Sequence, residues 1–184
     1  MKIVAIPGAL RAGSYNLKLA KALAALAPDG TSVEVATLHG IPLYDGDVEA
    51  QGIPEAVTAL KDEVAAADGL LIVTPEYNGS IPGVTKNAID WMSRPPADIP
   101  RVFGNKPAGV VGATTGPAGT RLSQAAWLPV LRALGTVPYF GGLLYVSSAA
   151  KVFDDAGNIV DQDVRDRAKK YIDGFAAFVA RMRP

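Results

Sequence analysis

The chain contains no cysteine. This absence excludes disulfide bonds, thiolate catalysis, iron–sulfur ligation and zinc sites with cysteine ligands, and it is typical of a cytoplasmic protein. Histidine occurs once, at His39, so a metal site would have to be built from carboxylates. The sequence has no cluster of carboxylates with metal-ligand spacing. We therefore expect no metal site, and we assign His39 to a surface loop.

Long apolar runs and an excess of charge of one sign are also absent. No stretch approaches the roughly 20 apolar residues that a membrane-spanning helix requires. The run from Ile3 to Ile6 is too short for the core of a signal peptide and leads into a turn. The formal net charge is zero, which removes any general attraction to nucleic acid or to an anionic membrane. We expect a cytoplasmic protein that binds neither.

What is present is an alternation of strand and helix patterns over 184 residues, which predicts one domain spanning residues 1–184. Short apolar runs predict strands at residues 2–7, 32–38, 69–74, 106–113 and 139–146. Helical periodicity predicts helices at residues 16–27, 55–66, 82–93, 120–134 and 161–183, and we expect the fourth to be interrupted or kinked near Pro129. Residues 39–52 and 94–105 are expected to be loops, and residues 153–160 a small hairpin or turn.

Five strands alternating with five helices predict the α/β class. The strand count favours a flavodoxin-like three-layer α/β/α sandwich, with a five-stranded parallel sheet in the order 2-1-3-4-5, over a six-stranded dinucleotide fold. In that order the loops that follow strands 1, 3 and 4 meet at one edge of the sheet. Ligands bind at this edge in open parallel sheets.

The loop after the first strand, from Gly8 to Asn16, has the composition of a phosphate site. Gly8 and Gly13 allow backbone conformations in which amide groups point at an anion. The following helix begins with its positive end nearby, Ser14 and Asn16 add donors, and Arg11 adds a guanidinium. The alternative is that Gly13 and Ser14 simply form a loop and a helix cap. The triphosphate-loop and Gly-x-Gly-x-x-Gly signatures are absent, which disfavours a kinase or a standard dinucleotide dehydrogenase.

The loop after the third strand, residues 75–80, is rich in constrained and polar residues. Pro75 fixes the backbone direction, and Asn78-Gly79 is a strong turn pair. Main-chain groups of such a turn are suited to the edge of a heterocycle, and Tyr77 to its face; the alternative is that Tyr77 covers the core. Glu76 is a candidate general base, although a structural role is preferred for a single carboxylate in this position.

The loop after the fourth strand contributes Thr114, Thr115, Gly116 and Gly119, whose hydroxyls and small size permit close approach of a ligand. Taken alone this loop indicates little, but it is expected at the same edge of the sheet as the other two.

Three segments together resemble the NADPH-dependent FMN reductase family of flavodoxin-like proteins, which includes quinone and chromate reductases. Residues 8–16 are similar to the phosphate loop of the family. Residues 74–83 followed by 86–91 match its most specific segment, and residues 41–45 also look like the family. The resemblance extends over essentially the whole chain.

The resemblance implies non-covalently bound FMN, with Arg11, Ser14 and Asn16 at the phosphate. Residues 75–79 would line the isoalloxazine ring, and the third loop its other edge. The cofactor-binding residues it implies are Arg11, Ser14, Tyr15, Asn16, Pro75, Glu76, Tyr77, Asn78, Gly79, Thr114, Thr115, Gly116 and Gly119. Because a bound flavin carries the chemistry, no side chain is nominated as catalytic acid or base.

The resemblance also implies hydride transfer from NADPH or NADH, through FMN, to a small-molecule acceptor such as a quinone, free flavin, an azo compound or chromate. It implies a homodimer or homotetramer. The alternative function is a flavodoxin-type electron carrier without its own substrate site, which the zero net charge disfavours because such carriers are typically acidic. A hydrolase or transferase is disfavoured because no nucleophile–base pair is visible.

Two positions depart from the family pattern. Ala9 replaces a serine in the phosphate loop, and Thr120 stands where a second glycine is common. We expect either change to weaken retention of FMN without altering the chemistry.

Five further side chains are ambiguous in the sequence. Trp91 and Trp127 suit either the core or a subunit interface. Arg94, Arg101 and Arg121 fall near the predicted site and suit the extra phosphate of NADPH, although a solvated surface role is preferred for each.

Overall fold

The structure is a computed structural model that describes residues 1–183. Its centre is a parallel sheet in the order β2-β1-β3-β4-β5, which confirms the predicted order. The strands are β1 (Lys2–Pro7), β2 (Ser32–Val35), β3 (Gly69–Val73), β4 (Pro107–Ala113) and β5 (Val137–Pro138), and β6 (Tyr145–Val146) also pairs with β4. In register, Val4 lies opposite Leu70, and Leu70 lies opposite Ala108.

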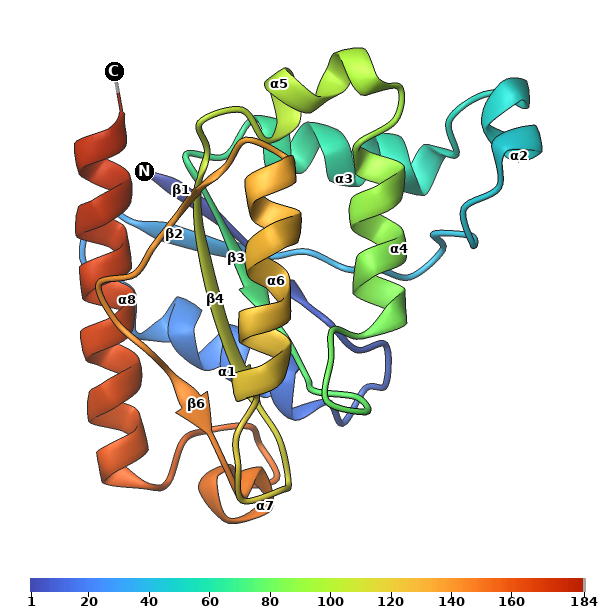
Figure 1. Cartoon of the computed structure of the whole chain (residues 1–184). Helices are drawn as coiled ribbons and strands as arrows, with labels where there is room; N and C mark the ends of the chain where they lie inside the picture. The colour runs from blue at the N-terminus through green and yellow to red at the C-terminus, as the bar shows by residue number, and fades with distance from the viewer. Residues whose placement is uncertain (184) are drawn as a thin grey trace.

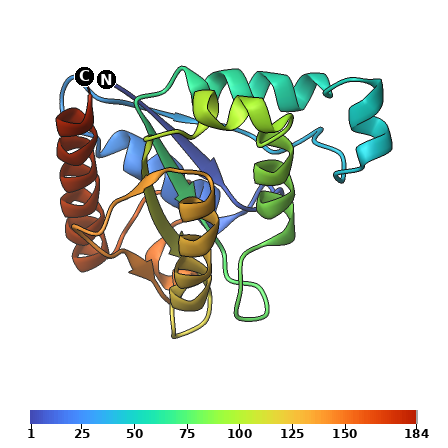
Figure 2. The ribbon, with the colours of Figure 1, turned by 45° about the horizontal axis from the view of Figure 1, so that its top comes forward.

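Helices cover both faces of the sheet, as Figure 1 shows. They are α1 (Tyr15–Ala25), α2 (Gly46–Gln51), α3 (Glu55–Ala65), α4 (Gly83–Met92), the 3₁₀ turn η1 (Pro96–Asp98), α5 (Ile99–Val102), α6 (Arg121–Ala133), α7 (Ala149–Val152) and α8 (Gln162–Met182). The turned view in Figure 2 shows α2 projecting at the opposite end of the molecule from α8.

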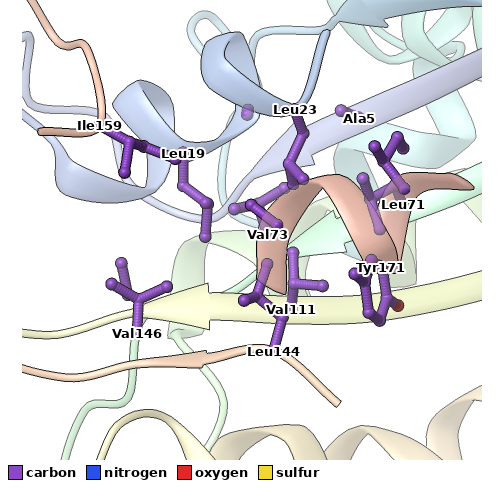
Figure 3. Close-up of a cluster of buried hydrophobic side chains, with 14 of the residues drawn as sticks. Ala5, Leu19, Leu23, Leu71, Val73, Val111, Leu144, Val146, Ile159 and Tyr171 are labelled. Atoms are coloured by element: carbon purple, nitrogen blue, oxygen red, sulfur yellow. The ribbon is translucent and has the colours of Figure 1, made fainter. Parts of the chain in front are cut away.

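Alternation along the strands divides the core into two layers, because successive side chains of a strand point to opposite faces. Ile3 and Ala5 of β1 face α1 and α8, in a cluster that includes Leu19, Leu71 and Tyr171 (Figure 3). Val4 and Ile6 face α3, α4 and α6 instead. Trp91 and Trp127 are both fully buried within the chain, which supports core packing rather than a subunit interface.

The predicted fifth strand at residues 139–146 is wrong as a continuous strand. Val137–Pro138 and Tyr145–Val146 each pair with β4, and the segment between them leaves the sheet. Val110 of β4 lies between the residues that pair with β5 and those that pair with β6. Its carbonyl oxygen lies 3.5 Å from the hydroxyl of Tyr171 on α8. A Cβ on Gly109 would lie 2.7 Å from this hydroxyl, so glycine makes the room for it. Burial raises the pKa of Tyr171.

Other differences are local. Residues 39–52 contain α2, residues 94–105 contain η1 and α5, and β2 ends three residues before the predicted boundary. Pro129 lies within α6 on its exposed side and does not interrupt the helix. The predicted hairpin is present, with Phe153 bridged to Ile159. No helix within residues 1–183 has the length and apolar character needed to cross a membrane.

Candidate functional site

Three loops at the carboxyl ends of β1, β3 and β4 surround one cavity of about 270 Å³. Nine of the thirteen predicted residues line it: Arg11, Ser14, Tyr15, Asn16, Pro75, Glu76, Tyr77, Thr114 and Thr115. Ala9 and Ala113 complete the lining, and Asn78, Gly79, Gly116 and Gly119 are not part of it. The sheet order thus brings together segments about 40 to 100 residues apart, as the position of the loops predicts.

The first loop ends in a helix cap. Ser14 is buried, and its hydroxyl oxygen accepts hydrogen bonds from the amides of Asn16 and Leu17 at 3.2 and 3.3 Å. Within the described chain, the amides of residues 12, 13 and 15 have no protein acceptor. Unfilled amides at a helix N-terminus form an anion site. The cap interpretation and the phosphate interpretation are therefore compatible, since the Ser14 hydroxyl keeps its own proton to donate.

Arg11 stands exposed at the edge of this loop, with its guanidinium carbon 5.7 Å from the centre of the Tyr15 ring. No carboxylate within residues 1–183 lies at ion-pair distance from it. Its charge is thus available to an anion in the cavity.

Asn16 has a structural role that its sequence context does not reveal. Its side chain accepts from the amide of Ala113 and donates to the carbonyl oxygen of Ala113, both at 2.9 Å. This pair joins the first turn of α1 to the end of β4. One hydrogen of the Asn16 amide remains for a ligand.

The second loop is a tight hairpin. Tyr77 and Ser80 exchange backbone hydrogen bonds of 3.2 and 3.0 Å. Asn78 and Gly79 both have positive φ, 52° and 71°, as a type I′ turn requires. The predicted turn pair is confirmed, but its tip extends beyond the cavity. Tyr77 is 48% exposed and lines the cavity, so it does not cover the core.

Glu76 connects this hairpin to α6. One carboxylate oxygen, Oε2, accepts from the amides of Leu122 and Ser123 at 2.9 and 3.1 Å. Below it, the hydroxyl of Thr74 lies 2.8 Å from that of Ser123 and accepts from the Trp127 indole at 3.1 Å. These bonds support the preferred structural role of Glu76.

The third loop is fixed to the segment that follows β6. The Thr114 amide donates to Val146, the Ala149 amide to Thr114 and the Ser148 amide to Gly116, at 2.9 to 3.0 Å. Gly119 has φ 69°, and a Cβ there would lie 2.8 Å from that of Tyr145. Gly119 is thus required by the backbone and its neighbour, whereas Thr114 and Thr115 face the cavity.

The two departures from the family pattern lie in different surroundings. Ala9 lines the cavity, so the serine hydroxyl of the family pattern is absent from the site itself. Thr120 is fully buried, and its hydroxyl accepts from the Gln124 amide at 2.9 Å. It fills the space left by Gly112, where a Cβ would come within 2.3 Å of the Thr120 hydroxyl.

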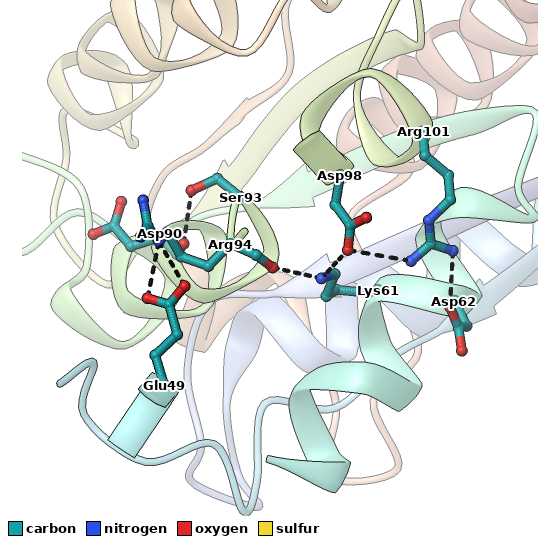
Figure 4. A network of polar contacts seen from close by, with 8 residues as sticks. All are labelled: Glu49, Lys61, Asp62, Asp90, Ser93, Arg94, Asp98 and Arg101. Carbon is teal, nitrogen blue, oxygen red and sulfur yellow. Dashed lines mark hydrogen bonds and ion pairs between the residues drawn. The ribbon is translucent and has the colours of Figure 1, made fainter. Parts of the chain in front are cut away.

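Two of the three candidate arginines are engaged in ion pairs, which Figure 4 shows. Arg94 contacts Glu49 at 2.9 Å, and Arg101 contacts Asp62 at 2.9 Å. The hydrogen bond from Arg94 holds the pKa of the Glu49 carboxyl below its usual value. Neither arginine lines the cavity.

Arg121 differs from both. Its guanidinium carbon lies 5.5 Å from the centre of the Tyr145 ring, beside the third loop. In the part of the chain that the structure describes, no carboxylate is within 4 Å of it. Across the same residues, no group of three or more histidine and carboxylate side chains is placed to hold a metal ion.

The model of the NADPH-dependent FMN reductase family matches residues 1–151. The chain belongs to this family. It is 40% identical to an NAD(P)H-dependent FMN reductase of Pseudomonas aeruginosa, over 100% of this chain and 97% of that protein. It is 41% identical to a 2-hydroxy-1,4-benzoquinone reductase of a Burkholderia species, over 100% and 98%.

Solved structures agree with this family and fold. A flavoenzyme NAD(P)H:acceptor oxidoreductase from Paracoccus denitrificans has a TM-score of 0.89 and 32% identity, with 98% of each chain covered. An archaeal flavodoxin has a TM-score of 0.65 at 12% identity, covering 98% of this chain and 99% of its own, and supports the fold alone. The predicted family and flavodoxin-like fold are confirmed.

The residues present fit FMN. Amides without protein acceptors at the start of α1, the Ser14 hydroxyl and Arg11, which has no ion-pair partner within residues 1–183, come together in the first loop, as a phosphate requires. Pro75 and Tyr77 provide apolar faces elsewhere in the lining, and Thr114 and Thr115 provide hydroxyls. This combination of an anion cradle with flat apolar surfaces suits a phosphorylated aromatic cofactor.

Proposed function

We propose that the protein is an FMN-dependent NAD(P)H oxidoreductase that reduces a small-molecule acceptor. The observation that carries the proposal is the single cavity shared by all three loops, in a chain of this family. The chemistry that bound FMN supplies is acceptance of a hydride and donation of two electrons. The residues of the chain bind and orient the cofactor and shield it from water.

The phosphate end is assigned to Arg11, Ser14 and the amides of Gly13 and Tyr15. A dianionic phosphate there would receive charge-assisted hydrogen bonds, which are roughly twice as strong as neutral ones. The positive end of α1 adds to this attraction. Asn16 contributes through its remaining amide hydrogen while it holds α1 against β4.

The ring end is assigned to Pro75 and Tyr77 on one side and to Thr114 and Thr115 on the other. Tyr77 is well suited to pack on a planar ring because it is half exposed and held by a closed hairpin. Within the cavity lining no histidine is present, and the carboxylate of Glu76 is already hydrogen-bonded. No side chain is therefore assigned as acid or base.

A quinone is the proposed acceptor, supported by the Burkholderia relative and by the half-exposed tyrosine at the cavity. Free flavin, azo compounds and chromate are further proposed acceptors. We also propose a homodimer or homotetramer, supported by exposed apolar side chains at Leu43, Phe140 and Leu143. A cytoplasmic location is proposed from the absence of cysteine.

The test is a titration of the purified protein with FMN, followed by oxidation of NADPH in the presence of a benzoquinone. We expect the flavin fluorescence to change on binding and NADPH to be consumed without added reductase. A flavodoxin-type carrier would bind FMN but would need a separate reductase. A protein that leaves flavin fluorescence unchanged at all concentrations would contradict the proposal.

A further inference from the structure

We propose that Glu76 is a positioning residue, which sets the place of the hairpin at residues 76–80 by holding it to α6. This inference rests on the proposed function, because the hairpin forms one wall of the proposed FMN site. It assigns to Glu76 a hydrogen-bond role through α6, in place of a role in proton transfer.

The first step is the cap that α6 lacks. Its N-cap residue, Thr120, makes no side-chain bond to the first turn of the helix, and its hydroxyl accepts from Gln124 instead. Free amides at a helix start need acceptors, and a carboxylate is favoured there by the helix dipole. Glu76, more than 40 residues earlier in the chain, supplies the acceptor for Leu122 and Ser123.

The second step concerns the other hydrogen bonds of the hairpin. The bonds between Tyr77 and Ser80 are internal to it. Within residues 1–183, Glu76 makes the hydrogen bonds that join residues 76–80 to another element, and no further such bond is present. The contacts of Thr74 with Ser123 and Trp127 anchor the strand below the hairpin, not the hairpin itself.

The third step links this tie to the cavity. Glu76 and Tyr77 both line it, so the hairpin carries a wall of the cavity. Without the tie, no hydrogen bond within residues 1–183 fixes the hairpin that carries Tyr77 to α6, and packing of Gly79 beside Leu122 is what remains. A bound ring would then have to order the hairpin, and that cost would appear as weaker binding.

The experiment compares two nearly isosteric variants. Glu76→Gln keeps a side-chain oxygen that accepts from the α6 amides, whereas Glu76→Met keeps the size and loses the acceptor. Glu55→Gln and Glu55→Met are the matched controls, because Glu55 begins α3 and lies outside the cavity. The readouts are FMN affinity, kcat at saturating FMN, and amide hydrogen exchange of the FMN-free proteins.

We expect Glu76→Met to bind FMN about tenfold more weakly, which corresponds to about 1.4 kcal/mol. Its amides at Leu122 and Ser123 should exchange faster than in the parent protein. Glu76→Gln should restore both properties to within about threefold of the parent values. The Glu55 variants should leave FMN affinity unchanged.

Three results would overturn the proposal. Loss of kcat in both Glu76 variants with normal FMN affinity would make Glu76 an acid or base. Unchanged amide hydrogen exchange at Leu122 and Ser123 in FMN-free Glu76→Met would show that Glu76 does not hold these amides in solution. If Glu76→Met lowered the free energy of unfolding but its folded fraction bound FMN as tightly as the parent protein, the role of Glu76 would be purely structural. Failure of the parent protein to bind FMN contradicts the proposed function instead, and the exchange data still test the tie.

Discussion

Two of the three loops that surround the cavity are held in opposite ways. The hairpin at residues 76–80 is closed by its own backbone bonds and joined to α6 through Glu76. The loop at residues 9–13 donates no backbone hydrogen bond within the described chain, although Arg11 accepts one from Ser14. One wall is thus organised before a ligand arrives, and the other presents donors that a ligand must satisfy.

This difference separates ligand binding from stability. The Arg11 side chain of the open loop can contribute to affinity with little effect on the fold, because within residues 1–183 it has no ion-pair partner to lose and contacts only the Tyr15 ring. A residue of the closed hairpin supports the local structure first and affects the ligand through it. Substitutions in the two loops should therefore divide between affinity and stability.

The largest effect is expected in the open loop. Arg11→Ala removes a guanidinium that has no carboxylate partner among the residues that the structure describes, and a charge-assisted hydrogen bond contributes about 1.5–3 kcal/mol. We expect FMN to bind about 10- to 100-fold more weakly, while the melting temperature of the FMN-free protein stays the same. Fluorescence titration and thermal unfolding measure the two quantities.

The control for Arg11 is Arg165→Ala, an exposed arginine on α8 that lies outside the cavity and has no ion-pair partner within residues 1–183. It should change neither quantity. Equal losses of affinity in both variants would show that net charge, rather than position, governs binding, and would remove the contrast between the two loops.

The next effect is expected in the closed hairpin. Gly79→Ala places a Cβ at φ 71°, which costs about 1–2 kcal/mol of stability for a residue other than glycine. We expect the free energy of unfolding to fall by about that amount, with a smaller change in FMN affinity than for Arg11→Ala. Chemical denaturation measures the loss.

Gly13→Ala is the matched control from the open loop, since Gly13 has no positive φ and a Cβ there meets nothing within 4 Å. Its stability should stay close to that of the parent protein. A larger loss at Gly13 than at Gly79 would contradict the division between the loops.

Much of this architecture is predictable from the sequence because buried strands and glycine-rich turns leave local signals. The β3 run and the Asn78-Gly79 turn are both read from neighbouring residues. The break in the fifth strand is not, since the Val110 carbonyl there accepts from Tyr171 of α8 instead of from a paired strand. Such a contact joins residues 61 positions apart and leaves no local pattern.

The same limit applies to the site. Its location follows from strand order, and nine of the predicted residues line the cavity. The partners of Asn16 and Glu76 lie 97 and 46 to 47 residues away, so these partners could not be identified from their own segments, although a structural role is preferred for Glu76. Polar residues at strand ends signal a site without showing which of them face the ligand.

A smaller effect is expected at the two departures from the family pattern. Ala9→Ser adds a hydroxyl to the cavity lining, and a hydrogen bond of about 0.5–1.5 kcal/mol would tighten FMN binding about two- to tenfold. Thr120→Gly should bring no gain, because Thr120 is buried away from the cavity and fills space beside Gly112. It should instead lower stability. If Thr120→Gly bound FMN more tightly and Ala9→Ser bound it with unchanged affinity, Thr120 and not Ala9 would be the departure that affects the cofactor site.

The smallest effect is expected at Arg121, which extends the comparison from the cofactor to the dinucleotide. Like Arg11, it is a cation with no carboxylate within 4 Å in the described residues, and it lies beside the third loop over Tyr145. An exposed contact of this kind contributes about 0.2–1 kcal/mol. Arg121→Ala should therefore raise KM for NADPH up to about fivefold and leave KM for NADH nearly unchanged. Arg101→Ala is the control, since that guanidinium is already paired with Asp62. If KM for both dinucleotides rose equally in the Arg121 variant, its charge would serve a feature common to both, such as the pyrophosphate, and not the additional phosphate of NADPH.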